Sequence, residues 1–350
     1  MSSFLRRMSN SFSPNAKDEA KAIEKEEEEE EEEFGPAVFV AGASMQEIEA
    51  PTERDLLAAA EGVWSQCDES SFLLRVGPNY AKTGAKEPSP SALFDLVGID
   101  FLRSNTRIKN IGKKVKFPSD WTDGYGSSDD EDGDGEEEGD DDVHIGGGHH
   151  VPTMLIVNTQ FPKDFNTSLF SEAPTDGEGW NLVHYFRIKK SVREELKDVE
   201  KASPAVKLLA RFCEEAPAGY TDSSSTWHGR FKLVTRCENI EEFGLPSFIT
   251  SYNAKPVLIR NTSTMYSSSS IEGKEGSCSY LEIDLNVHKF GSVPKKALAT
   301  MIDKFSSMRV SSGFCIESRK DDEMPETMLG VSTTYKPDHS KAMQWEEVCK

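Results

Sequence analysis

Two acidic tracts carry the whole net charge of this chain and limit which parts of it can build a core. The 350 residues include 61 Asp and Glu against 40 Lys and Arg, a formal charge of −21. Residues 26–33 supply eight acids, and residues 120–142 supply thirteen with no Lys or Arg. Runs of like charge repel one another and bury little apolar surface. The core must therefore form from the remainder, which is formally neutral and lacks the basic footprint that nucleic-acid binding requires.

No segment indicates a membrane span, a secretory signal or a disulfide framework. Apolar runs fall short of the ~18 residues typical of a transmembrane helix, and the Arg- and Ser-rich start lacks a signal-length apolar stretch. The six cysteines are scattered without a C-x-x-C pair, which favours reduced, packed thiols over disulfides or structural zinc. We therefore expect a cytoplasmic protein, which could still associate peripherally with membranes.

Changes in composition divide the chain into three parts. Residues 1–50 are Ser-rich and then acidic, which predicts a disordered tail. Residues 51–335 form the expected domain, interrupted by a disordered acidic insertion at 119–150, and 336–350 form a C-terminal tail. Thr52 is the expected cap of a first helix. Its predicted buried stripe is Leu56, Ala60, Val63 and Trp64.

The hydrophobic pattern of the domain predicts mostly strands, with three later helices. Ser191 with Glu194 predicts a capping box, and Ser203–Pro204 and Ser292–Pro294 predict two further helix starts. The segment 93–102 is ambiguous between helix and strand. Regular crossover helices do not separate the strands, so we expect an antiparallel α+β fold. The expected strands are 72–76, 154–157, 182–188, 230–236, 256–262, 280–288 and 308–317.

Two metal-like patterns lie in the acidic insertion. Residues 130–141 partly match an EF-hand calcium loop, but Glu137 stands where an apolar residue normally packs and the twelfth position lacks Glu. His144, His149 and His150 offer imidazole ligands beside acids, yet the glycines between them give no rigid support. We therefore expect no metal site, and no motif implies another cofactor.

Residues 280–288 alternate apolar and polar side chains, as a strand with two different faces does. The polar row includes Glu282, Asp284 and His288, which could hold a metal or act as an acid–base pair. Most alternating strands have a solvated polar face. We therefore expect a half-solvated row, which would become a substrate or headgroup contact if it faced a cavity.

A second strand, 230–236, places Arg230, Lys232 and Arg236 on one face. Such a row of cations could receive an anionic headgroup or phosphate. The same cations could instead pair with the acids of the polar row across a sheet. Both interpretations remain open from the sequence.

No nucleophile or nucleotide-binding motif stands out. The sequence has no G-x-S-x-G, phosphate loop or H-E-x-x-H. Possible general bases are His184, His228 and His288, but none has a partner visible in the sequence. We therefore predict that the protein is not an enzyme.

Short motifs follow one another in a set order between Trp64 and Gly330. They are Phe72–Val76, Gly98–Phe101, Ile108–Ile111, Val157–Pro162, Val183–Phe186, Arg230–Leu233, Lys255–Pro256, Tyr280–Asp284 and Glu323–Glu326. Each is weak alone, but their order resembles the Enhanced Disease Resistance 2 C-terminal domain family.

The resemblance implies an association with lipids and no specific chemistry. In plant relatives this domain follows a pleckstrin-homology domain and a lipid-transfer START domain, and such proteins are tied to lipids, membranes and negative regulation of defence. The N-terminal 50 residues leave no room for either domain, so we expect a stand-alone member. No catalytic residue carries over, and a START-like curved sheet with packed helices is one form that the fold could take.

Three functions follow as hypotheses, of which we favour the first. The first is a non-enzymatic, lipid-associated regulatory module, in which Arg75, Arg230 and Lys232 meet a lipid or anionic headgroup. The second is a scaffold that binds protein partners through its acidic tracts. The third is an enzyme acting on lipid or acyl substrates through the polar row.

Overall fold

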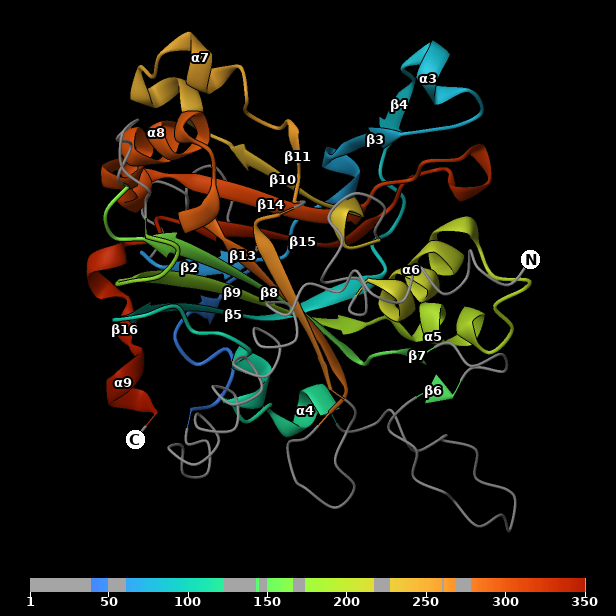
Figure 1. Ribbon diagram of the computed structural model, residues 1–350, viewed down its shortest axis with the longest axis horizontal. Coiled ribbons are helices and arrows are strands. Elements are labelled where there is room, and N and C mark those ends of the chain that lie inside the picture. The colour runs from blue at the N-terminus through green and yellow to red at the C-terminus, as the bar shows by residue number, and fades with distance from the viewer. Residues whose placement is uncertain are drawn as a thin grey trace, which may run out of the picture.

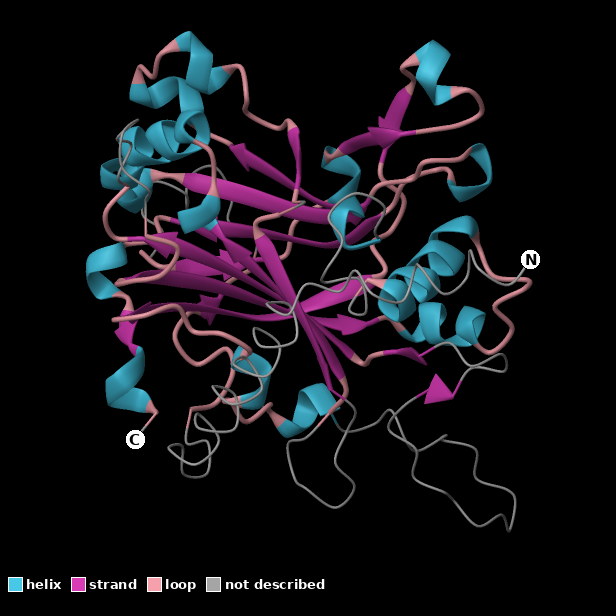
Figure 2. Cartoon of the chain, in the orientation of Figure 1, coloured by secondary structure: helices cyan, strands magenta, loops and turns pink. Residues whose placement is uncertain are grey.

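Two six-stranded sheets face one another and enclose the main apolar core (Figure 1). The computed structural model describes residues 39–49, 61–122, 143–144, 150–165, 174–216, 227–259, 261–268 and 278–349. Most neighbouring strands are antiparallel, and helices lie at the ends and margins of the sheets (Figure 2). The predicted antiparallel α+β class is therefore confirmed, whereas a START-like curvature is not.

The two sheets, called sheet I and sheet II, have six strands each. In spatial order, sheet I consists of β1 (Gln46–Glu47), β2 (Val63–Ser65), β15 (Met328–Tyr335), β14 (Arg309–Ile316), β10 (Phe231–Cys237) and β11 (Pro256–Leu258). Sheet II consists of β12 (Ser263–Ser268), β13 (Tyr280–Asn286), β8 (Met154–Pro162), β9 (Gly179–Ile188), β5 (Phe94–Ser104) and β16 (Met343–Gln344). In sheet I only β1 and β2 pair in parallel. In sheet II two pairs are parallel, β13 with β8 and β16 with β5.

The helices are short, and the longest closes one end of the main core. This helix, α6 (Pro204–Glu215), buries Phe212, whose ring lies 6.3 Å from that of Phe231 in sheet I. Ser203 caps α6 as predicted, because its side chain accepts from the N–H of Val206. The predicted capping box of α5 (Lys190–Leu196) is wrong, since Lys189 occupies the cap position without a side-chain bond. The other helices in the described part of the chain are α3 (Tyr80–Thr83), α4 (Ser119–Thr122), α7 (Ser247–Thr250), α8 (Ser292–Met301) and α9 (Trp345–Val348).

Two small hairpins complete the described structure. β3 (Leu73–Arg75) pairs with β4 (Lys86–Pro88) beyond the edge of the main sheets, and β6 (Val143–His144) pairs with β7 (His150–Val151). The EF-hand-like loop 130–141 and His149 lie outside the described residues. No helix in the described part of the chain combines the length and the apolar character that crossing a bilayer requires.

A third layer covers the outer face of sheet II and includes parts of both predicted tails. Residues 39–44 pack there, and Asp100 holds them by accepting the N–H groups of Gly42 and Ser44 at 2.7 and 2.9 Å. From the predicted C-terminal tail, Trp345 packs edge-to-face on Phe39 with ring centroids 5.8 Å apart. The prediction of disorder is therefore wrong for residues 39–49, and the predicted C-terminal tail packs against them through Trp345.

Two strands of sheet I differ from the sequence-based expectation. Val63 and Trp64, predicted on a helix, lie on β2, and the preceding residues 51–60 lie outside the described residues. The central strand β15 was not predicted, because Gly330 inside an apolar run usually indicates a break. A Cβ at Gly330 would lie 2.4 Å from the ring of Phe186, so glycine allows sheet I to approach sheet II closely here.

Candidate functional site

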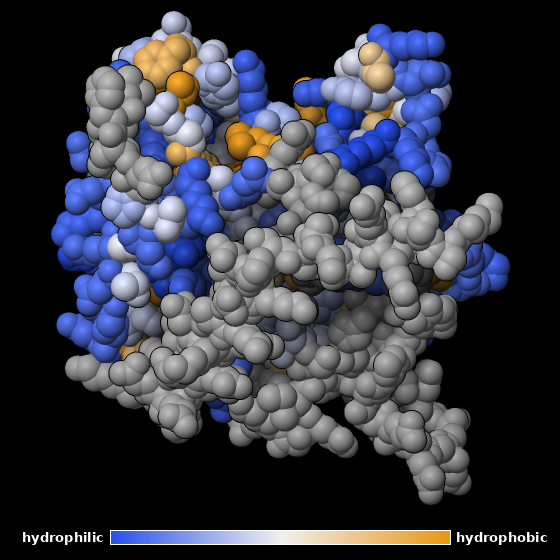
Figure 3. All heavy atoms as spheres, viewed as in Figure 1, coloured by the Kyte–Doolittle hydropathy of each residue, from blue (hydrophilic) through white to orange (hydrophobic). Residues whose placement is uncertain are grey.

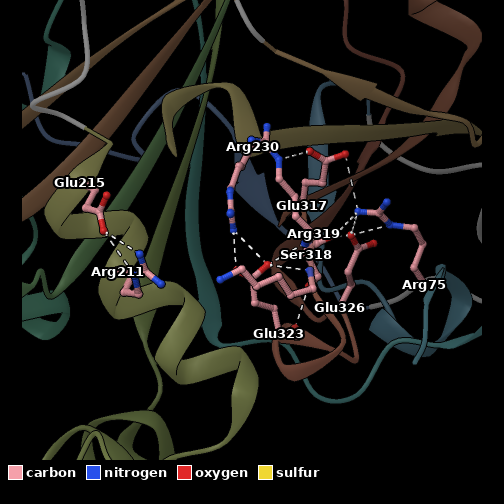
Figure 4. A network of polar contacts seen from close by, with 10 residues as sticks. Arg75, Arg211, Glu215, Arg230, Glu317, Ser318, Arg319, Glu323 and Glu326 are labelled. Carbon is pink, nitrogen blue, oxygen red and sulfur yellow. Dashed lines mark hydrogen bonds and ion pairs between the residues drawn. The ribbon is translucent and has the colours of Figure 1, made fainter. Parts of the chain in front are cut away.

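The three cations predicted to bind an anion come together on the outer side of sheet I. Figure 4 shows two of them, Arg75 and Arg230, with their partners. Arg75 comes from β3, Lys232 from β10, and Arg230 ends a 3-10 helix at Trp227–Arg230. All three face one segment, residues 317–326, which follows β14. The tertiary structure thus joins residues that are far apart in the sequence.

Glu326 is the centre of this network and is 1 % exposed. Its Oε1 accepts from Arg75 Nε at 2.8 Å and from the N–H of Ser318 at 3.0 Å, and its Oε2 lies 2.6 Å from Lys232 Nζ. Burial alone would raise the pKa of Glu326, but Arg75 and Lys232 lower it. The carboxylate therefore stays ionised and ties β3, β10 and the 317–326 segment together.

Glu323 holds the third cation in a similar way. Both of its carboxylate oxygens accept from Arg230 Nη1 at 3.1 Å, and Oε2 also accepts from the N–H of Arg319 at 2.6 Å. The guanidinium of Arg230 stacks on Trp227, with its central carbon 3.9 Å from the ring centroid. Arg230 and Lys232 are thus buried and paired with carboxylates.

The alternative prediction, that these cations pair with Glu282 and Asp284, is wrong. Those acids lie on β13 in sheet II, whereas Lys232 lies on β10 in sheet I. Arg236 contacts Glu238 and the carbonyl of Ser71 instead. The actual partners belong to the motif Glu323–Glu326, which the family resemblance had singled out without a role.

An open cleft of ≈ 630 Å³ lies beside this network, between α3 and the 317–326 segment. Four of its side chains are cationic, Arg75, Lys82, Arg319 and Lys320, and two are acidic, Glu317 and Asp321. The acids are engaged: Glu317 accepts from Arg319 Nε at 2.9 Å, and Asp321 accepts from the N–H of Asn79 at 3.0 Å. Within the described residues, the ammonium groups of Lys82 and Lys320 form no ion pair. The lining residues are Arg75, Asn79, Tyr80, Ala81, Lys82, Glu317, Ser318, Arg319, Lys320, Asp321 and Met324.

Only Arg75 among the three predicted cations lines the cleft. Sequence reasoning missed Lys82, which lies in the four-residue helix α3, and Arg319 and Lys320, which lie in a loop, because such short polar segments have no hydrophobic period. The sequence shows only that basic residues lie close to the motifs Phe72–Val76 and Glu323–Glu326. Basic residues are common on protein surfaces, so this did not indicate a site.

The predicted polar row on β13 is buried, and the expectation of a half-solvated face is wrong. Glu282 and Asp284 are 0 % exposed because the third layer, including residues 105–122, covers this face of sheet II. His288 lies beyond the end of β13, in a 3-10 helix at Val287–Lys289. Burial and then the charge of Arg107 lower the pKa of His288 to about 4.

Glu282 and Asp284 form a buried acid pair whose oxygens serve the fold. Glu282 accepts the N–H groups of Ile111 and Gly112, both at 2.8 Å, and Asp284 accepts from Asn158 Nδ2 at 3.0 Å. Burial, followed by the charge of Glu282, raises the pKa of Asp284 well above its usual value. The pair thus fastens the third layer to sheet II, and the raised pKa favours the protonated form of Asp284.

Replacing Asp284 by Asn should make the protein more stable at mildly alkaline pH. Because the folded-state pKa of Asp284 is raised, its contribution to the free energy of unfolding is full at acid pH and falls as pH rises above the unfolded value. Asparagine mimics the protonated acid and does not ionise. Urea unfolding at about pH 5 and about pH 8 should show a smaller decline for Asp284→Asn than for the natural chain.

The exposed Asp164 offers a matched control, since Asp164→Asn makes the same substitution outside the core. It should leave the pH dependence of unfolding unchanged. An equal decline in the natural chain and in Asp284→Asn would contradict the protonated state of Asp284.

His184 and His228, the other candidate general bases, are buried in the fold. His184 lies between the sheets against Phe186 and Phe314, and His228 Nε2 lies 2.8 Å from Ser263 Oγ. In the part of the chain that the structure describes, no group of three or more His, Cys, Asp or Glu is arranged to hold a metal. His144 and His150 pair across the β6–β7 hairpin.

A family model agrees with the order of motifs along this fold. The model described as Protein ENHANCED DISEASE RESISTANCE 2, C-terminal matches residues 64–336. Comparison with curated proteins and with solved structures found no match. The matched span includes the ion-pair network, the cleft beside it and the buried acid pair.

Proposed function

We propose that this chain, which belongs to the Enhanced Disease Resistance 2 C-terminal family, is a non-enzymatic, lipid-associated module. In this proposal its cleft holds an anionic headgroup. The observation that carries this proposal is the surplus of cations in the cleft. Its two acids are already bonded within the protein, and the exposed Lys82 and Lys320 remain for a ligand. Phosphate oxygens are the natural acceptors for such ammonium groups.

The buried cations have a supporting role in this proposal. Arg230 and Lys232 neutralise Glu323 and Glu326, so these carboxylates do not oppose an anion in the cleft. Arg75 both lines the cleft and bonds Glu326, and its guanidinium lies 5.0 Å from the ring centroid of Tyr80. A headgroup would therefore contact Lys82, Lys320 and the outer edges of Arg75 and Arg319.

Replacing both lysines, Lys82→Ala with Lys320→Ala, should weaken headgroup binding. Each lysine near an anionic lipid surface contributes about 1 kcal/mol, so the pair should weaken affinity by roughly thirtyfold. Both side chains are exposed, and the fold should not change. The measurement is titration calorimetry with inositol trisphosphate as a soluble headgroup.

A control of equal charge is Lys197→Ala with Lys201→Ala, on the exposed surface near α5 and α6. It should bind inositol trisphosphate as the natural chain does. The proposal is overturned if the natural chain does not bind the probe, or if both double variants weaken binding equally. Arg230 and Lys232 are unsuitable for this test, because removing them would leave buried carboxylates unpaired.

The alternative proposal is that the acidic tracts bind protein partners. Residues 26–33 and 123–142 of these tracts lie outside the described residues. The structure indicates where a deletion that tests this alternative should begin. Trp121 in α4 is buried and packs on Tyr185, with ring centroids 5.5 Å apart. A deletion should therefore begin after Thr122, so that a loss of partner binding is not a loss of folding.

A further inference from the structure

A lobe at residues 244–259 presents aromatic side chains to solvent. It contains α7 and β11 and projects from the upper end of the molecule in Figure 1. Phe248 is 45 % and Tyr252 is 60 % exposed, and they lie four residues apart, on one side of this helical turn. Val257 on β11 is 47 % exposed. Figure 3 shows apolar side chains gathered at this end.

The lobe is fastened firmly to sheet I, so the exposure of its aromatic rings is built into the fold. Ile249 is buried beneath it. The side chain of Asn253 accepts the N–H of Cys237 at 2.8 Å and donates to the Cys237 carbonyl at 3.0 Å. The N–H of Ala254 donates to the carbonyl of Thr235 at 3.0 Å. Because these contacts hold its backbone, the lobe loses little backbone entropy when it meets a partner.

The charged side chains of the lobe and of the neighbouring stretch 285–302 are all basic. Residues 244–259 contain no Asp or Glu, and neither do residues 285–302, which include α8. α8 and the following turn pack beside the lobe through Leu245, Met301 and Phe305. Lys255 and Lys296 are exposed on these two stretches. Outside the two acidic tracts the chain is formally neutral, so these two neighbouring stretches carry a local positive charge.

We propose that this surface docks on an anionic lipid bilayer. The docking face consists of Phe248, Tyr252, Val257, Val293, Lys255 and Lys296. Exposed aromatic and aliphatic side chains enter the interfacial region of a bilayer, where tyrosine keeps its hydroxyl in water. Lysines beside them gain from the negative surface potential, whereas acids would be repelled.

In Figure 1 the lobe lies at the upper left and α3, which borders the cleft, lies at the upper right, so both project from the upper side of the molecule. None of its residues lines the cleft, so the inference is carried by different side chains from those of the proposed function. A bilayer that contacts the docking face would also be close to a headgroup in the cleft.

The test is cosedimentation of the full chain with vesicles of phosphatidylcholine and phosphatidylserine. The natural chain should bind, and Phe248→Ser with Tyr252→Ser should weaken partition by about tenfold or more. Lys255→Ala with Lys296→Ala should weaken binding to these vesicles, but should not change the residual binding to pure phosphatidylcholine. The control Val40→Ser alters another exposed apolar residue, in the segment 39–49, and should bind normally.

Three outcomes would overturn the inference: no binding of the natural chain to the anionic vesicles, equal binding by the aromatic variant, or a dimer that the aromatic variant dissociates in native mass spectrometry. The last outcome would assign the face to a second copy of the chain. Because phosphatidylserine vesicles contain no phosphoinositide, failure of inositol trisphosphate to bind would leave this test intact.

Discussion

Replacing Glu326 by Gln should destabilise the protein by about 3–5 kcal/mol, the cost typical of breaking a buried ion pair from one side. Glu326 is 1 % exposed and is the counter-charge of both Lys232 and Arg75. Without its charge, the buried ammonium of Lys232 loses the carboxylate that compensates it. Urea unfolding at neutral pH should measure the loss as a lower transition midpoint.

Two further variants separate the ion pair from simple packing. Glu194→Gln breaks the exposed pair with Lys197 and should change the free energy of unfolding by no more than about 0.5 kcal/mol. Glu326→Met combined with Lys232→Met removes both charges and should recover part of the loss. A loss for Glu326→Gln as small as that of Glu194→Gln would show that the network does not hold the 317–326 segment.

Acidification should destabilise the natural chain through His184. Burial lowers the pKa of His184 from 6.5 to about 4. Its contribution to the free energy of unfolding is therefore full above the unfolded pKa and is lost as pH falls through this range. The loss amounts to about 3 kcal/mol. His184→Leu cannot take up a proton, so its free energy of unfolding should fall less between about pH 7 and about pH 4.

Phe186→Leu is the matched control for His184→Leu. Phe186 stacks on His184 with ring centroids 6.0 Å apart, and its replacement should lower stability by a similar amount at each pH. His288, with a pKa also lowered to about 4, should leave a residual slope in both variants. If His184→Leu retained the full acid slope of the natural chain, titration of His184 would not be its cause.

Much of the strand content was predictable because the relevant information is local. The apolar run before Pro162 and the alternation from Tyr280 to Asn286 each predicted a strand that the structure contains. Ser203 and Pro204 likewise predicted a helix start, since capping depends on neighbouring backbone groups. In contrast, β15 escaped prediction because the need for Gly330 arises from a ring on the facing sheet.

The sequence by itself determined the α+β class, the family, and the two acidic tracts that stand apart from a neutral remainder. Only the tertiary structure decided what the charged side chains do. Whether Lys232 meets a ligand or Glu326, and whether Glu282 faces water or the N–H of Ile111, depends on which distant segment covers each sheet. Alternation along a strand reveals that its two faces differ, but not what lies over them. Which segment covers each face depends on long-range packing, because packing brings groups that are far apart in the sequence within hydrogen-bonding distance.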